Sequence, residues 1–230
     1  MALEPQATPA PAVNTSRSFP DRAVLFVARH WLLLVNLAVF IFIGLPILAP
    51  FLAEAGLERP AYWIYSAYRI TCHQLPYRSY FIGGPAFTHS VAEIEAVTGV
   101  NDKFALIHRP LVNSVFGSQT AVCHRDIAIY GAVLVAGLVF GLVRDRLKPL
   151  PFKFFLLFVI PIAVDGFTQL LGGLVPFLPA RESTWFLRTV TGALFGIGGV
   201  WLAYPYIEQG MREIRQSLEK ASQDSDLVLT

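Results

Sequence analysis

Long apolar runs separated by polar stretches dominate the chain. Four of these runs approach the roughly 20 apolar residues that a helix needs to cross the hydrocarbon core of a bilayer. The pattern therefore predicts an all-α membrane protein with about four transmembrane helices. We expect the spans at residues 30–53, 127–143, 154–175 and 185–206.

The connections between the predicted spans differ in length and charge. The first is long and covers residues 54–126, whereas the second is short and basic. Residues 61–71 are aromatic and apolar but too short to cross, which is typical of a helix lying at the membrane interface. Basic residues also precede the first span and follow the fourth, and positive charge marks the cytoplasmic side. We therefore expect a multi-pass protein of the plasma membrane with both termini in the cytoplasm and the long connection outside.

The two ends of the chain differ in composition from its middle. Residues 1–22 are rich in alanine and proline, which predicts a disordered tail. Residues 23–210 are expected to form a single transmembrane domain, followed by a polar cytoplasmic tail at residues 211–230.

The overall composition is that of a lipid-facing surface. Charged residues make up only 15% of the chain and hydrophobic residues 54%, and the mean hydropathy is +0.53. A soluble domain carries about 25% charged residues, so a soluble enzyme is excluded. The net charge of +2 gives no indication of nucleic acid as a partner. The expected partner is the lipid bilayer.

Small residues recur at helical spacing in two of the spans. Gly137 and Gly141 lie four residues apart in the second, and Gly192 and Gly196 repeat this spacing in the fourth. Small residues let helices approach closely in lipid. The two pairs therefore predict helix contacts, with other membrane subunits or with a second copy of the chain among the expected partners.

Two ionisable residues lie inside predicted spans. Asp165 falls near the midplane of the third span, and Arg188 about one and a half turns into the fourth. A charge at such a depth costs on the order of 3 kcal/mol without a partner, which predicts an Asp165–Arg188 ion pair. The pair suits a structural lock between helices or, with His73, a set of candidate catalytic residues, and the sequence leaves both readings open.

Each of the two cysteines is followed by a histidine, at Cys72-His73 and Cys123-His124. Thiolate and imidazole are ligands for zinc and other transition metals. Because adjacent side chains diverge, we expect a metal site built from Cys72, His73, Cys123 and Asp126, with His124 as a substitute for His73. A structural Cys72–Cys123 disulfide is one alternative, since an outward position is oxidising. Two unlinked structural thiols are the other.

Arg78 and Arg125 flank the cysteine motifs. Arginine binds carboxylate or phosphate through two parallel hydrogen bonds. Together with Gln169, which shares a helix face with Asp165, these arginines are the residues predicted to bind an anionic cofactor, metabolite or lipid headgroup. Anchoring of helices at the level of the bilayer phosphates is the simpler alternative for either arginine alone.

Four motifs give the chain a family resemblance. They read Cys-His-Gln-x-Pro-x-Arg-Ser from residue 72, Val-Cys-x-Arg-x-x-x-Ile-Tyr-Gly from 122, Asp-Gly-x-Thr-Gln from 165 and Glu-Ser-Thr-x-x-x-Arg-x-x-Thr-Gly from 182. Together they resemble DUF2085, a family of prokaryotic membrane proteins, from about Tyr65 to Gly199. The resemblance implies an integral membrane protein and supplies no activity.

The chain departs from the family pattern in two places. Family members often have a third cysteine where this chain has Asp126, and a carboxylate is a harder ligand than a thiolate. Residues 84–120 have the character of an insertion between the first two motifs. The first departure weakens the case for a metal here, and the second offers a surface for a partner.

Two functions of different classes follow from these features. One is a metal-binding or redox site at the outer end of the helix bundle. The other is a non-catalytic accessory or assembly subunit of a larger membrane complex, with the cysteines as a disulfide. Metal analysis of the purified protein and co-purification at fixed stoichiometry distinguish the two.

Overall fold

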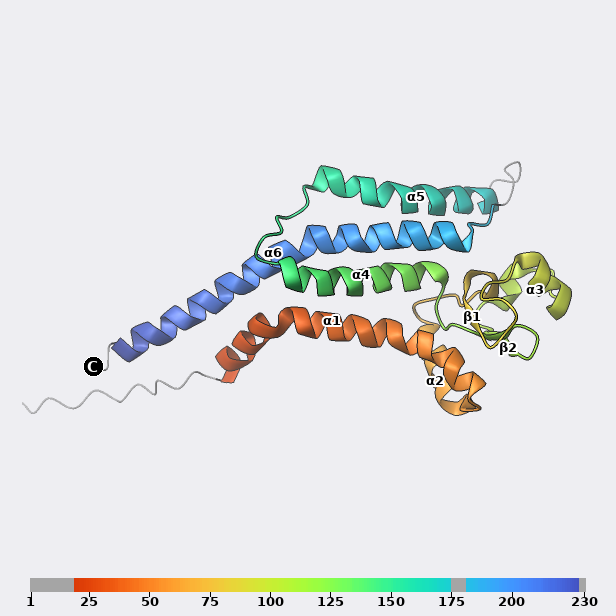
Figure 1. The fold of residues 1–230 in the computed structure, drawn as a ribbon, viewed down its shortest axis with the longest axis horizontal. Coiled ribbons are helices and arrows are strands. Elements are labelled where there is room, and N and C mark those ends of the chain that lie inside the picture. Colours follow the sequence, from red (N-terminus) through yellow and green to blue (C-terminus); the bar gives the residue numbers. More distant parts are fainter. Residues whose placement is uncertain (1–18, 175–180, 228–230) are drawn as a thin grey trace, which may run out of the picture. The chain divides into compact units, whose positions relative to one another are not determined.

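The computed structural model describes residues 19–174 and 181–227. Among these residues, four helices are long and apolar enough to cross a membrane, which confirms the predicted all-α membrane fold and its four spans. The helices are α1 (Phe19–Glu54), α4 (His124–Val143), α5 (Phe152–Leu174) and α6 (Trp185–Leu227), shown in Figure 1.

The chain divides into two compact units. One comprises the described residues of Met1–Trp31 together with those of Glu208–Thr230, and the other comprises Leu32–Ile207. Helices α1 and α6 each contribute to both units. The predicted spans and the candidate site residues belong to the second unit, apart from the first two residues of the first span, His30 and Trp31.

In the first unit, α6 continues to Leu227 through a stretch that was expected to be a polar tail. Buried Glu208 accepts a hydrogen bond from Trp31 Nε1 at 2.9 Å. It also pairs with Arg212 at 3.3 Å and with Arg215 at 3.1 Å. Charge pairs one and two turns apart stabilise a helix, so residues 211–227 are helical. Helix α1 likewise begins at Phe19, inside the predicted N-terminal tail, whose residues 1–18 lie outside the described residues.

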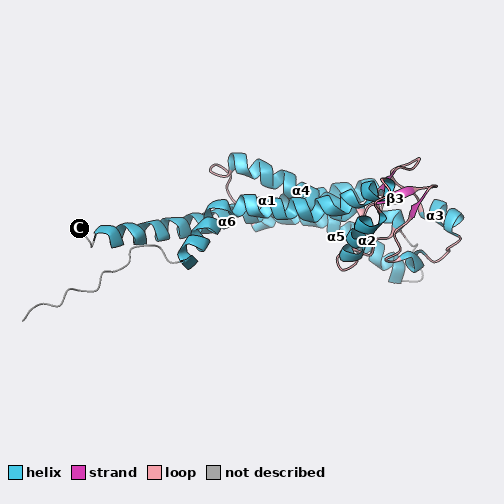
Figure 2. Cartoon of the chain, turned by 90° about the horizontal axis from the view of Figure 1, so that it is seen from below, coloured by secondary structure: helices cyan, strands magenta, loops and turns pink. Residues whose placement is uncertain are grey.

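In the second unit, the membrane helices run side by side (Figures 1 and 2). Two glycines allow a short distance between α6 and α4. A Cβ atom on Gly196 would lie 2.4 Å from the Ile129 carbonyl oxygen. A Cβ atom on Gly192 would lie 3.0 Å from the Ala128 Cβ. This glycine pair therefore packs against the chain's own α4.

The glycine pair of α4 faces α1 in the same way. A Cβ atom on Gly137 would lie 2.2 Å from Asn36 Oδ1, and one on Gly141 would lie 3.4 Å from the Leu32 side chain. The close helix contacts expected from the glycine spacing are thus contacts within the chain. The chain's own helices lie against these glycines, and self-association stays a prediction.

The long connection between α1 and α4 is folded. It contains α2 (Glu58–Tyr68), α3 (Val91–Thr98), the 3₁₀ turns η1 (Pro76–Arg78) and η2 (Lys103–Leu106), and three short strands. Strand β3 (Gly117–Gln119) pairs antiparallel with both β1 (Phe81–Ile82) and β2 (Val112–Asn113). Figure 2 shows the strands at the same end of this unit as α2, the helix expected at the membrane interface.

The predicted insertion at residues 84–120 has a small apolar core. Four buried side chains, Phe81, Ile94, Leu106 and Phe116, pack together across β1, α3 and the turns that follow it. A capping box at Ser90 and Glu93 satisfies the free N–H groups at the start of α3. The segment is therefore a structured extension of the bundle, stabilised by its own apolar core and helix cap.

Two prolines of α1 explain how the long connection is held against that helix. Proline lacks an N–H, so Pro46 and Pro50 leave the carbonyls of Phe42 and Pro46 without their helical partners. The Tyr68 hydroxyl donates to the Phe42 carbonyl, and the Ala121 N–H donates to the Pro46 carbonyl at 3.1 Å. Lipid offers such carbonyls no hydrogen bond, so α2 and the segment before α4 complete the backbone of α1.

A carbonyl freed by a proline is also satisfied from outside the helix in α6, at Pro205. This proline leaves the carbonyl of Trp201 without its helical donor. The backbone N–H of Leu150, in the basic connection between α4 and α5, donates to that carbonyl at 3.3 Å. The connection is thereby docked on α6, where the Trp201 indole N–H also donates to the Lys148 carbonyl at 3.2 Å.

We predict that Tyr68→Phe lowers the melting temperature of the protein in detergent. The variant keeps the ring and leaves the Phe42 carbonyl without a donor, which corresponds to a loss of about 1–3 kcal/mol. The matched variant Tyr62→Phe, at a side chain that is 57% exposed, should melt as the wild type does. Equal melting of all three proteins would show that the Tyr68 hydrogen bond contributes nothing.

Candidate functional site

The buried carboxylate of Asp165 on α5 is fully paired. Arg125, in the first turn of α4, donates to Oδ2 at 2.5 Å, and the Ser183 hydroxyl donates to the same oxygen at 2.7 Å. Arg181 donates to Oδ1 at 3.2 Å. The Asp165 side chain is only 2% exposed. Three hydrogen bonds, two of them from arginines, therefore satisfy this buried carboxylate.

The predicted Asp165–Arg188 ion pair is wrong: among the described residues, Asp165 pairs with Arg125 and Arg181 instead. Buried Arg188 donates to Gln169 Oε1 at 3.0 Å, to the Ser183 carbonyl at 3.2 Å and to Glu182 Oε2 at 3.5 Å. Glu182 lies three residues before the start of α6, and its carboxylate accepts a hydrogen bond from Arg188. The prediction failed because it considered only charges inside the spans.

Glu182 is the second centre of the network. Arg78 of η1 donates through one guanidinium nitrogen to both Glu182 oxygens at 3.0 Å, and the Gln169 amide donates to Oε2. Glu182 thus joins the long connection to α5 and α6. Glu182 and Ser183 belong to the fourth polar motif of the sequence, but neither they nor Arg181 were among the predicted site residues. Charged residues directly before an apolar span were a signal for them.

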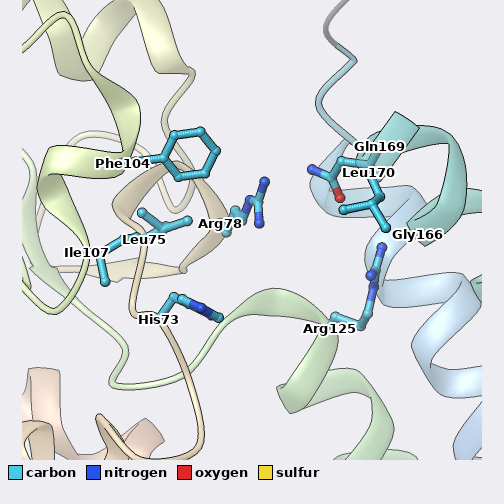
Figure 3. A pocket seen from close by; sticks show the side chains of 9 residues that line it. All are labelled: His73, Leu75, Arg78, Phe104, Ile107, Arg125, Gly166, Gln169 and Leu170. Atoms are coloured by element: carbon cyan, nitrogen blue, oxygen red, sulfur yellow. The ribbon is translucent and has the colours of Figure 1, made fainter. Parts of the chain in front are cut away.

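A cavity of about 410 Å³ opens beside this network. Figure 3 shows His73 and Arg78, from the long connection, on one side of it and Gln169 on α5 on the other, with Arg125 below Gly166. The structure therefore brings together the three residues predicted to bind an anionic ligand. The residues that line the cavity are His73, Leu75, Arg78, Phe104, Ile107, Arg125, Gly166, Gln169 and Leu170.

The two cysteines converge beside the start of α4. The sulfur atoms of Cys72 and Cys123 and a carboxylate oxygen of Asp126 all lie within 4.8 Å of one another. Both cysteines are free thiols. The Cys123 thiol donates to Asp126 Oδ2 at 3.2 Å. A hydrogen bond from Cys123 lowers the pKa of Cys72, and the same bond, together with burial, raises the pKa of Cys123.

The two histidines predicted as ligands lie outside this group. His73 lines the cavity, and its ring stacks on His108 with 6.2 Å between centroids. His124 is 2% exposed, and its ring packs on Tyr80 at 4.3 Å. Among the described residues, the metal-ligand group comprises Cys72, Cys123 and Asp126. Neighbouring side chains point apart, and this places each histidine away from its cysteine.

A second cavity, of about 400 Å³, shares Glu182 with the network. It is lined by Tyr77, His89 and His124, and within the described part of the chain the Tyr77 hydroxyl, His89 Nε2 and both His124 nitrogens have no hydrogen-bond partner. Burial raises the pKa of Tyr77 to about 12. Its hydroxyl therefore remains protonated and available as a donor at neutral pH.

Four membrane-crossing helices with a network of arginines and carboxylates at one end define a polytopic membrane protein with a polar site. The family model of DUF2085, described as a predicted membrane protein, matches residues 112–202. An uncharacterised protein of Methanocaldococcus jannaschii is 31% identical over 186 residues, covering 77% of this chain and 92% of that protein. The chain belongs to the DUF2085 family. No solved structure matches it significantly.

We predict that Glu182→Gln lowers the melting temperature clearly. The neutral amide leaves Arg78 and buried Arg188 without the carboxylate that they share, a loss of about 1–3 kcal/mol. Glu58→Gln, at an exposed position in the first turn of α2, serves as the matched control and should melt near the wild type. A Glu182→Gln protein that melts with this control would contradict the role of Glu182 as a network centre.

Proposed function

We propose that the protein binds a divalent transition metal, such as zinc, through Cys72, Cys123 and Asp126. The observation that carries this proposal is the convergence of two thiols and a carboxylate within 4.8 Å. Cys72 follows α2, whereas Cys123 and Asp126 lie at the start of α4, and the two cysteines are 51 positions apart in the chain. A chance grouping of two free thiols and a carboxylate across such a separation is uncommon.

The donor spacing suits tetrahedral zinc. Zinc–sulfur bonds of about 2.3 Å and zinc–oxygen bonds of about 2.0–2.2 Å place the donors of one ion about 3.5–4 Å apart. Structural zinc sites use four protein ligands, whereas catalytic sites use three and keep the fourth position for water or substrate. Three donors therefore favour a reactive site over a purely structural one.

The first turn of α4 serves both parts of the site. Cys123 and Asp126 are three residues apart and share one helix face, which is the face of the proposed metal. Arg125 points away from that face, lines the cavity and pairs with Asp165. Catalytic roles for His73, Asp165 and Arg188 stay predictions.

The proposed orientation places this site outside the cell. Support comes from the basic connection between α4 and α5, because positive charge is retained on the cytoplasmic side. Both termini would then lie in the cytoplasm of a plasma-membrane protein. A cytoplasm-active reporter fused after Thr230 should be active, and activity from an exported reporter alone would reverse the orientation.

A larger membrane complex is the alternative role for the chain. The structured insertion at residues 84–120 supports this reading, since it gives the bundle a surface outside the lipid. Assembly would be recognised by partners that co-purify at fixed stoichiometry from native membranes. A protein that purifies alone and binds zinc would favour the metal proposal instead.

We predict about one zinc per chain in protein purified without chelator. Cys72→Ser and Cys123→Ser should lose the metal, and Asp126→Asn, which replaces a charged ligand by a neutral amide, should bind it much more weakly. Asp102→Asn is the matched control, because Asp102 caps η2 away from the cluster and asparagine caps equally well. Elemental analysis measures the bound zinc, and thiol titration measures whether the two cysteines are reduced or oxidised. Two oxidised cysteines and no metal would overturn the proposal in favour of the disulfide.

A further inference from the structure

The network beside the cavity has more positive than negative charge. Each carboxylate is shared by more than one arginine: Arg125 and Arg181 contact Asp165, while Arg78 and Arg188 contact Glu182. These contacts set four guanidinium groups against two carboxylates. Counting Asp126 as a third carboxylate still leaves a positive excess. Unbalanced charge is costly near lipid, so an anion would stabilise this end of the bundle.

The two cavity arginines keep unused donors. Arg78 and Arg125 each donate to protein through only one of their three guanidinium nitrogens, among the described residues. The Nε atom of each is buried, and no partner for it lies in the described part of the chain. A guanidinium group has five N–H donors. Most of the hydrogen-bonding capacity of both side chains is therefore left for something in or beside the cavity.

The walls of the cavity combine these charges with apolar surface. Leu75, Phe104 and Ile107 line it from the long connection, and Leu170 lines it from α5. Gly166 and Gln169, also on its wall, lie about 8–12 Å along α5 from the end of the helix at Leu174. The cavity therefore offers a ligand both a charged wall and an apolar wall.

We propose that this cavity binds a phosphoryl group, carried by the headgroup of an anionic lipid or by a free phosphorylated molecule. Two arginines on separate elements suit a group with several acceptor oxygens, and arginine is the residue of choice for phosphate. The apolar wall would contact the glycerol and upper acyl chains when a lipid is bound. This site uses none of the three metal donors, so it does not depend on the proposed metal.

The ligand class is tested on the purified full-length protein in detergent. The probes are dioctanoyl phosphatidylglycerol, dioctanoylglycerol with the same chains and no phosphate, and inorganic phosphate, each titrated against the melting temperature. Stabilisation by phosphatidylglycerol alone supports a lipid ligand, and stabilisation by phosphate as well supports a soluble one. Equal stabilisation by dioctanoylglycerol and phosphatidylglycerol, or stabilisation by none of the probes, overturns the proposal.

A blocking variant tests the location without removing a charge. A Cβ atom on Gly166 would lie 3.6 Å from Arg125 Nη1, so Gly166→Leu adds a side chain to the cavity wall beside the arginine. Gly131→Leu on α4 is the matched control, because no atom lies within 4 Å of its added Cβ.

We expect Gly166→Leu to weaken phosphatidylglycerol binding about tenfold or more, which corresponds to the loss of one charge-assisted hydrogen bond. Gly131→Leu should bind as the wild type does. Zinc content measured on the same samples separates this site from the metal, since Gly166→Leu should retain its zinc. Unchanged phosphatidylglycerol affinity in Gly166→Leu would contradict the placement in this cavity.

Discussion

Asp165 brings a charge into a part of the molecule where lipid offers no partner, and the architecture around it follows from that constraint. Its three hydrogen-bond donors come from the start of α4 and from the segment that leads into α6. Satisfying one carboxylate therefore fixes three helices relative to one another at this end of the bundle. The same arrangement leaves arginines in excess, and this excess gives the cavity its chemistry.

The backbone obeys the same constraint. Pro46 and Pro50 interrupt the hydrogen bonding of α1, and groups from the long connection satisfy the carbonyls that they free. The connection is thereby held against the bundle, with Cys72 just after α2 and Cys123 directly before α4. That anchoring explains how thiols 51 positions apart come within reach of one another and of Asp126.

The sequence was sufficient to predict the four spans and a short helix after the first of them, because apolar length carries that information locally. Residue type alone suggested the grouping of Cys72, Cys123 and Asp126, and the folded connection is what brings them together. The three-stranded sheet was missed, since strands of two or three residues are too short to show alternation. The partner of Asp165 was missed for another reason. The sequence favoured Arg188 because it lies inside a span, whereas the pairing with Arg125 depends on Glu182, whose position is a tertiary property.

The pairing of Asp165 with Arg125 is tested most directly by two double-mutant cycles on unfolding free energy. One cycle combines Asp165→Asn with Arg125→Gln, and the other combines Asp165→Asn with Arg188→Gln. Residues in direct contact couple by about 0.5–3 kcal/mol, so the account predicts strong coupling in the first cycle and clearly weaker coupling in the second. Coupling to Arg188 that equals or exceeds the coupling to Arg125 would contradict it.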